Sequence, residues 1–364
     1  MKIALVHDYL INFSGAEQVL LALHELYPSA PIYTAIYNKE SCPQFNDATV
    51  HTSFLQTWPL AKTKYRQYIP LLPLANESYD LSAYDVVISD CHIATKGVIT
   101  KPETIHISYC HTPIRYAWLS HIDPRASGSF MPWLSPIARA AAHYLRIWDS
   151  LAADRVDHWV ANSKYIANRI DKYYRKTAKV IYPPVNVEAF EISEKIEDYY
   201  VFCSRLIDYK LPDIVIDAFN ILGKKLIVIG RGPMAEQLKA KAMPNVKIMT
   251  EYLPNSQLAV IFSHASAMIF PAEEDFGIVM VEMMAAGRPV IAYHLGGASE
   301  IVIPGKTGEL FTLQTPEAII KAVAAFDPMG YDGKVIREHA LKYDRSAFKK
   351  QLEEYIDTVI KKER

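Results

Sequence analysis

The sequence feature that most constrains the fold is an alternation of short apolar runs with segments of helical periodicity. The segment 15–26, for example, carries apolar residues at helical spacing and comes after the apolar run 3–6. This alternation is typical of parallel sheets in which a helix connects each strand to the next. In the first half of the chain, strands are expected at 3–6, 85–89, 104–109 and 157–161, and a helix at 163–174.

A proline pair interrupts the alternation near the middle of the chain, in the extended segment 179–186. Proline disfavours helix at the residue before it, so this segment is expected to link two domains. The alternation then restarts. Strands are expected at 199–203, 225–230, 245–249, 267–270 and 289–292, and helices at 213–222, 256–263, 277–286 and 316–325.

The chain of 364 residues is too long for one ordinary hydrophobic core. We therefore expect an α/β fold of two doubly wound domains that face each other across a central cleft. The expected domains are residues 1–182 and 183–345, followed by a C-terminal helical segment over 346–364.

The composition indicates a globular protein and excludes several kinds of function. Half of the residues are apolar and 22% are charged, and the net charge of −1 provides no field of one sign for DNA or RNA. The cysteines show neither CxxC spacing nor the density of a disulfide scaffold, which favours reduced thiols. No stretch approaches the ~20 apolar residues that span a bilayer, so the protein is expected in the cytoplasm.

Two cations follow the expected strand 199–203. Arg205 and Lys210 would lie near the carboxyl end of that strand, where a forked guanidinium and an ammonium suit phosphate groups. The alternative is a pair of solvated surface charges. A glycine turn, Gly230-Arg-Gly-Pro233, follows another expected strand, and a tight strand-to-helix turn needs glycine in any case.

Glu274 and Glu282 lie eight residues apart around the expected start of a helix. Within one helix, residues at this spacing are separated by ~12 Å along the axis and by roughly 80° around it. The two carboxylates could not act on one bond in that arrangement. Gly277 is expected to mark the helix start, which would leave Glu274 on the preceding loop and Glu282 inside the helix. The alternative is two exposed charges.

The chain carries four further motifs: Gly287-Arg-Pro-Val290, Gly296-Gly-Ala-Ser-Glu300, Ser14-Gly-Ala-Glu-Gln18 and the string from Cys110 to Trp118. Together with Arg205, Lys210 and the glutamate pair, the second-half motifs resemble the retaining family-four glycosyltransferases of GT-B fold. The motif Ser14-Gly-Ala-Glu-Gln18 joins this resemblance, and the string from Cys110 to Trp118 resembles bacterial mannosyltransferases of O-antigen and polysaccharide assembly, the WbaZ-like group. This resemblance implies two Rossmann-like domains and a C-terminal helix that crosses back to the first domain.

The resemblance also implies a role for each site residue. Arg205 and Lys210 would hold the donor diphosphate, Glu282 would bind the ribose, and Glu274 would bind hydroxyls of the donor sugar. His111 would bond the transferred sugar, with a satisfied structural histidine as the alternative. Further donor contacts are implied for Gly15, Gly230, Arg231, Phe276, Gly277 and Ile278.

The reaction implied by the resemblance is transfer of a sugar with retention, by front-face attack and without an enzyme nucleophile. No metal and no cofactor are expected, and the expected donor is GDP-mannose. The acceptor would be lipid-linked or an oligosaccharide in cell-surface polysaccharide or lipopolysaccharide synthesis. The alternatives are an epimerase or phosphorylase of the same fold and a non-catalytic sensor of sugar nucleotides.

A basic and aromatic segment in the first half predicts a membrane or acceptor surface. Lys62, Lys64 and Arg66 alternate with Tyr65 and Tyr68, without an acidic residue among them. Such a segment suits the anionic inner face of the cytoplasmic membrane. The alternative is a solvated loop, and a second, weaker candidate with exposed aromatic side chains lies at residues 130–134.

Overall fold

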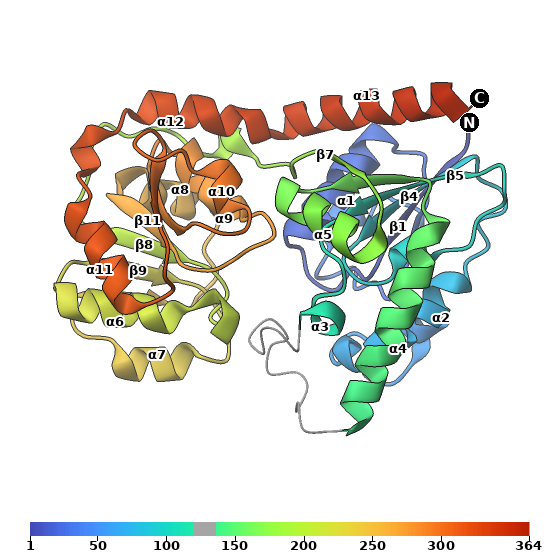
Figure 1. The fold of residues 1–364 in the computed structure, drawn as a ribbon, viewed down its shortest axis with the longest axis horizontal. Helices are drawn as coiled ribbons and strands as arrows, with labels where there is room; N and C mark the ends of the chain where they lie inside the picture. The colour runs from blue at the N-terminus through green and yellow to red at the C-terminus, as the bar shows by residue number, and fades with distance from the viewer. Residues whose placement is uncertain (120–135, 364) are drawn as a thin grey trace. The chain divides into compact units, whose positions relative to one another are not determined.

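The computed structural model of the chain describes residues 1–119 and 136–363 (Figure 1). These residues form two compact units. The first unit comprises Met1–Pro184 together with the C-terminal segment from Phe348, and the second comprises Val185–Ala347. The sequence predicted the corresponding divisions two residues earlier, before residues 183 and 346.

The first unit is built on a seven-stranded parallel sheet of order β3-β2-β1-β4-β5-β6-β7. Its strands are β1 (Ile3–His7), β2 (Ile32–Thr34), β3 (Val50–Thr52), β4 (Val86–Cys91), β5 (Ile105–Cys110), β6 (His158–Ala161) and β7 (Ala178–Val180). Its helices are α1 (Gly15–Leu26), α2 (Leu72–Glu77), α3 (Arg115–Trp118), α4 (Pro136–Ala152) and α5 (Lys164–Tyr174). The four strands predicted in this half are confirmed.

Successive residues of β1 enter different parts of the core because strand side chains alternate between the two faces of a sheet. Leu5 joins a cluster with α1, whereas Ala4 and Val6 join a cluster beneath the other face. The helix α13 (Arg345–Glu363) extends the first cluster, and the ring of Phe348 meets that of Tyr109 at 5.8 Å. The C-terminal helix therefore contributes to the core of the first unit.

The second unit contains a six-stranded parallel sheet of order β10-β9-β8-β11-β12-β13. Its strands are β8 (Tyr200–Cys203), β9 (Leu226–Ile229), β10 (Val246–Met249), β11 (Ala267–Phe270), β12 (Val290–Tyr293) and β13 (Gly308–Phe311). Its helices are α6 (Pro212–Leu222), α7 (Ala235–Lys241), α8 (Asn255–His264), α9 (Ile278–Ala285), α10 (Ala298–Ile301), α11 (Pro316–Ala325) and α12 (Gly333–Ala340).

Helices cover both faces of the second sheet (Figure 1). Phe219 of α6 and Val323 of α11 pack with Phe202 and Val228 of the sheet. Met280 of α9 is fully buried in a helix that packs against β11 and β12. The predicted α/β, doubly wound architecture is confirmed for each unit, and the cleft predicted between them stays a prediction.

The structure corrects the sequence prediction in several places. The expected linker 179–186 begins inside β7, which pairs with β6. The sequence missed β2, β3 and β13, and also the helices α4 and α7. β2 and β3 have three residues each, which is too short for a recognisable alternation.

Candidate functional site

The second sheet reverses its strand order between β8 and β11, the place where open parallel sheets bind ligands at their carboxyl ends. The segment that follows β8 contains Arg205 and ends with the short turn Asp208–Lys210. The loop that follows β11 contains Glu274. The strand order therefore brings the three predicted residues to one point of the second unit.

Lys210 and Glu274 form an ion pair at this point. The ammonium group of Lys210 donates to Oε1 of Glu274, and the two side chains are 12% and 13% exposed. The ammonium lies 5.1 Å from the ring centre of Tyr209, whose hydroxyl accepts a 2.7 Å hydrogen bond from the exposed guanidinium of Arg205. Both cations thus lie beside one tyrosine. The sequence assigned Lys210 and Glu274 to different parts of a ligand and did not predict their contact.

A glycine turn supports the segment that carries Arg205. A Cβ atom on Gly230 would lie 1.8 Å from the carbonyl oxygen of Ser204, and one on Gly232 would lie 2.1 Å from that of Leu206. The amide of Leu206 in turn donates to the carbonyl of Arg231 at 2.8 Å. Glycine is therefore required because two backbones touch. The side chain of Arg231 is exposed and donates to the carbonyl of Thr250, 3.0 Å away.

A second glycine turn supports the loop of Glu274 in the same way. A Cβ atom on Gly296 would lie 2.3 Å from the carbonyl oxygen of Glu274, and one on Gly297 would lie 2.2 Å from that of Phe276. The amide of Gly297 donates to the carbonyl of Glu274 at 2.8 Å. The Gly-Gly motif therefore fixes the path of the glutamate loop rather than meeting a ligand through side chains.

Glu274 and Glu282 have different structural settings, as the helix geometry predicted. Gly277 has a φ of +97° and is the N-cap of α9, so Glu274 precedes the helix and Glu282 lies within it. Ile278 is the first residue of α9. The ring of Phe276 is buried against Tyr343, which leaves its backbone as the part that a ligand could meet.

Glu282 is partly buried, and this burial raises the pKa of its carboxyl group to about 7. The shift has a physical cause, because removal from water disfavours the charged form. Near neutral pH the side chain therefore exists in both protonation states. A titratable group perturbed in this way is a candidate for ligand binding.

The first unit has its own reversal of strand order, between β1 and β4. His7 ends β1 and pairs in register with Asp90 of β4, and His111 directly follows the neighbouring strand β5. Asp90 contacts both histidines: Oδ2 lies 2.8 Å from Nδ1 of His7, and Oδ1 lies 2.5 Å from Nε2 of His111. His111 is 12% exposed, whereas the side chains of His7 and Asp90 are fully buried. The sequence predicted His111 but missed its two partners.

The buried network extends to the predicted donor loop. Nε2 of His7 lies 3.6 Å from Oε1 of Glu17, whose other oxygen accepts hydrogen bonds from the backbone amide and the hydroxyl group of Ser14. Ser14 caps α1, and Gly15 is the first residue of that helix. The predicted residues Gly15 and His111 therefore belong to one unit and are linked through three buried side chains.

Electrostatics hold the centre of this network in its charged form. Burial alone would lower the pKa of His7, but its hydrogen bonds to Asp90 and Glu17 raise it to about 10. Burial alone would raise the pKa of Asp90, but the charges and hydrogen bonds of His111 and His7 hold it at about 2. His7 is consequently a cation and Asp90 an anion at neutral pH.

The predicted membrane or acceptor segment lies partly on the surface. Lys62, Lys64 and Arg66 are exposed. The two tyrosines are only partly exposed, because Tyr65 packs against Tyr9 with ring centres 4.6 Å apart and Tyr68 donates a hydrogen bond to the carbonyl oxygen of Pro59. Apolar side chains of this region are also exposed: Trp58 at 40%, Leu60 at 59% and Leu74 at 58%.

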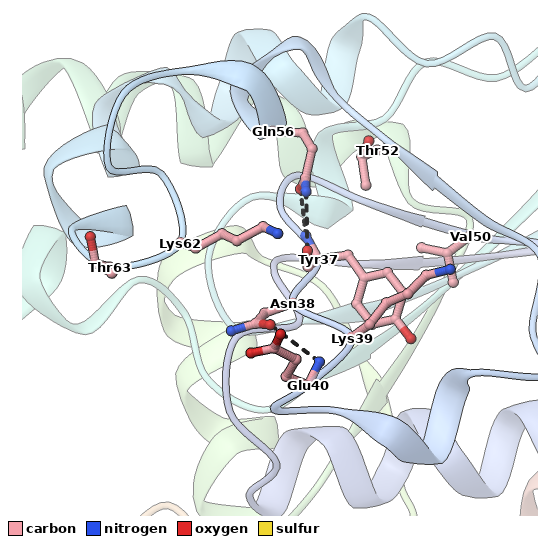
Figure 2. Close-up of a pocket in the computed structure, with 9 residues that line it drawn as sticks. All are labelled: Tyr37, Asn38, Lys39, Glu40, Val50, Thr52, Gln56, Lys62 and Thr63. Atoms are coloured by element: carbon pink, nitrogen blue, oxygen red, sulfur yellow. Dashed lines mark hydrogen bonds between the residues drawn. The ribbon is translucent and has the colours of Figure 1, made fainter.

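A pocket of about 530 Å³ lies beside this segment (Figure 2). Lys62 extends into it toward Gln56, whose amide group pairs with the backbone of Tyr37 at 2.8 and 3.1 Å. Lys39 and Glu40 also line it, so the pocket offers polar and charged groups. No motif in the sequence predicted this pocket. The other aromatic candidate, residues 130–134, lies outside the described residues.

Among residues 1–119 and 136–363, none of the helices combines the length and the apolar character needed to cross a membrane.

The comparisons with known proteins concern both the sequence and the fold. Residues 185–327 match the family model described as glycosyl transferases group 1. An uncharacterized glycosyltransferase of Methanocaldococcus jannaschii is 31% identical over 175 residues, which are 47% of this chain and 50% of that protein. The alpha-1,3/1,6-mannosyltransferase alg2 of Schizosaccharomyces pombe is 24% identical, over 85% of this chain and 70% of that protein. The chain spans about half the length of the first of these relatives.

The fold resembles the solved structure of HepE from Anabaena in complex with UDP and glucose. The TM-score is 0.70 at 17% identity, and the match covers 98% of this chain and 99% of HepE. Together with the family match, this likeness confirms the predicted GT-B fold class. The predicted WbaZ-like, O-antigen specificity stays a prediction.

Proposed function

We propose that this chain, whose residues 185–327 match the group 1 glycosyl transferase model, transfers a sugar from a nucleoside diphosphate donor to a lipid-linked or oligosaccharide acceptor with retention of configuration. The observation that carries the proposal is the arrangement of Lys210, Arg205 and Glu274 at the strand-order reversal of the second sheet. This arrangement places two cations and a carboxylate at the edge where parallel sheets bind ligands. Such a set suits a ligand that carries both phosphates and hydroxyls.

Each residue has a separate role in the proposed reaction. The bond between the sugar's anomeric carbon and the diphosphate oxygen breaks, and the ammonium of Lys210 and the guanidinium of Arg205 stabilise the negative charge that grows on the diphosphate. The acceptor hydroxyl attacks from the same face and gives its proton to the leaving phosphate oxygen. Glu274 binds sugar hydroxyls and Glu282 binds the ribose. Neither glutamate acts as a nucleophile, and the proposal includes no metal or cofactor.

The proposed donor is GDP-mannose. The named activity of the S. pombe relative supports mannose. The UDP and glucose named with HepE make UDP-glucose the main competitor. A thermal-shift panel of GDP-, UDP- and ADP-sugars tests the choice, because a ligand at 100 times its dissociation constant stabilises a protein by about 2.7 kcal/mol. We expect the largest rise in melting temperature with GDP-mannose, and no rise with any nucleotide sugar would contradict the proposal.

Donor binding should strengthen as the pH rises through 7. A ribose hydroxyl donates best to the ionised form of Glu282, whose pKa of about 7 in the free protein is raised by burial. The folded-state pKa lies above the ordinary value, so the free protein also loses stability from this group as the pH rises through about 7. Between pH 6 and pH 8 the donor dissociation constant should fall by about tenfold.

Calorimetric titrations at several pH values measure this effect. The control is Glu282→Gln, which keeps the shape of the side chain but cannot ionise, and its donor affinity should be independent of pH over this range. An equal pH dependence in the wild type and the variant would show that another group is responsible.

The first unit is proposed to contact an anionic membrane surface through Lys62, Lys64 and Arg66. Each cation near such a surface contributes about 1 kcal/mol. Replacing all three with glutamate should therefore reduce the binding to phosphatidylserine vesicles by at least about 10²-fold in a flotation assay. A control that replaces Lys350, Lys361 and Lys362, which are exposed on α13, changes the net charge equally and should leave binding intact. Absence of wild-type flotation would exclude this surface.

A further inference from the structure

Asp90 bridges two histidines from within the core of the first unit. One carboxylate oxygen faces Nδ1 of His7 at 2.8 Å and the other faces Nε2 of His111 at 2.5 Å. His7 and Asp90 are fully buried, so water does not compete for these contacts. A buried carboxylate with this geometry can control which ring nitrogen of His111 carries the proton.

The charge on His7 fixes the direction of both hydrogen bonds. His7 is a cation that donates from Nδ1 to Asp90, and Glu17 lies 3.6 Å from its other ring nitrogen. Asp90 is ionised and can only accept. A neutral His111 must therefore donate from Nε2, which leaves a lone pair on Nδ1. In the described part of the chain, the structure gives Nδ1 of His111 no hydrogen-bond partner.

We propose that Asp90 is a positioning residue: whenever the ring of His111 is neutral, Asp90 holds its proton on Nε2, so that Nδ1 presents a lone pair to the transferred sugar. This inference rests on the proposed function and on the role that the family resemblance implies for His111, which is to bond the transferred sugar. Asp90 acts through His111 and does not touch the substrate.

The tautomer matters because the sugar becomes positively charged as the diphosphate leaves, as in other glycosyl transfers that pass through an oxocarbenium-like state. A lone pair directed at the sugar stabilises that charge, whereas an N–H group would oppose it. The protein does not need to reorganise at the moment of reaction, because His111 is already oriented by a buried partner. The amide of Asn162 also donates to the carbonyl of His111 at 3.0 Å, which holds the backbone in place.

The positively charged ring of His7 also helps to hold Asp90 in position. The ring of His7 occupies one oxygen of Asp90 and leaves the other directed at His111. Glu17 holds His7 and also binds the hydroxyl and amide of Ser14 at the start of α1. The network is therefore anchored in two strands and one helix of the first unit.

Asp90→Asn should reverse the tautomer without removing the hydrogen bonds. The single oxygen of the asparagine would face the cationic His7, so its NH₂ group would donate to Nε2 of His111 and move the ring proton to Nδ1. Nitrogen-15 NMR of the full chain labelled at histidine distinguishes the tautomers. The proton is expected on Nε2 in the wild type and on Nδ1 in Asp90→Asn, whose kcat should fall by about 10²-fold while KM for the donor changes little.

Ser89→Ala provides a matched control. Ser89 is the preceding residue of β4, and its hydroxyl contacts Nε2 of the buried His106 on β5 at 2.8 Å. This variant should shift the resonances of His106 and leave the tautomer of His111 and kcat unchanged. A merely structural role for Asp90 predicts a loss of stability in Asp90→Asn without a move of the ring proton of His111.

Two outcomes would overturn the inference. The first is a proton on Nδ1 of His111 in the wild type, a measurement that needs neither a substrate nor a variant that folds. The second is a reversed tautomer in Asp90→Asn with unchanged kcat. Failure of the proposed function has a different signature, because a chain that transfers no sugar would still show the expected tautomer.

Discussion

Replacing Lys210 with methionine should reduce donor turnover by about 10²- to 10³-fold and leave the fold intact. The ammonium group is one of two cations at the strand-order reversal of the second unit's sheet, and it is mostly shielded from water. Loss of one preorganised charge-stabilising group typically has an effect of this size on kcat. The measurement is the initial rate of nucleoside diphosphate release, with circular dichroism to check the fold. Lys210→Arg, which keeps the charge, should retain more of the activity.

The partner Glu274 allows a sharper version of this test. In the free protein Lys210 is paired with Glu274, so Lys210→Met also leaves a partly buried carboxylate alone. The double variant Lys210→Met/Glu274→Gln should recover the lost stability but not the lost turnover. Recovery of turnover in the double variant would show that the pair is structural. A sensor of sugar nucleotides would instead bind the donor and release no diphosphate in the wild type.

Replacing Lys96 with methionine should destabilise the first unit by about 3–5 kcal/mol, the usual effect of breaking a buried ion pair by removing one partner. Lys96 is fully buried, and its ammonium pairs with Asp149 of α4 and donates to the carbonyl of Ile93 at 2.7 Å. Burial alone would lower the pKa of Lys96, but the Asp149 charge raises it above its ordinary value. The other oxygen of Asp149 accepts hydrogen bonds from Trp118 at 2.7 Å and from Tyr174 at 2.6 Å.

The expected loss corresponds to a fall of roughly 6–20 °C in the melting temperature of a unit of this size, measured by calorimetry. Lys101→Met is the matched control, because Lys101 is exposed, and its melting temperature should stay within about 2 °C of the wild type. The double variant Lys96→Met/Asp149→Asn should recover part of the loss, since it removes the unpaired charge. Equal melting temperatures for Lys96→Met and the wild type would contradict a stabilising role for the pair.

Several helices could be predicted because their apolar residues recur with the period of a helix. The helix 316–325 was predicted with the bounds that α11 has, and its N-cap Thr315 accepts a hydrogen bond from the amide of Ala318. The helix α4 was missed, and it exposes Tyr144, Ile147 and Leu151 to solvent. The amphipathic period of α4 is nevertheless strong, so the sequence did carry a signal for this helix.

The site could be predicted in part from strand ends. Arg205, Lys210 and Glu274 all follow expected strands, and the strand order then brings them together. The ion pair between Lys210 and Glu274 joins residues 64 positions apart, and spacing along a chain does not reveal such a contact. His7 and Asp90 did carry a signal, because each is a charged or titratable residue at the end of an apolar run. A buried polar group of this kind requires a partner.

The central claim is that this chain moves a sugar from a nucleotide donor to an acceptor, and transfer of label tests it most directly. The full chain is incubated with GDP-mannose labelled in the sugar and with membranes as a source of acceptor, and the label is then followed into extracted lipid and oligosaccharide. UDP-glucose labelled in the same way serves as the competing donor. The account predicts label in the product with the wild type, an α-linkage like that of the donor, and almost none with Lys210→Met. Equal incorporation by the two proteins, or label that stays in both donors, would contradict it.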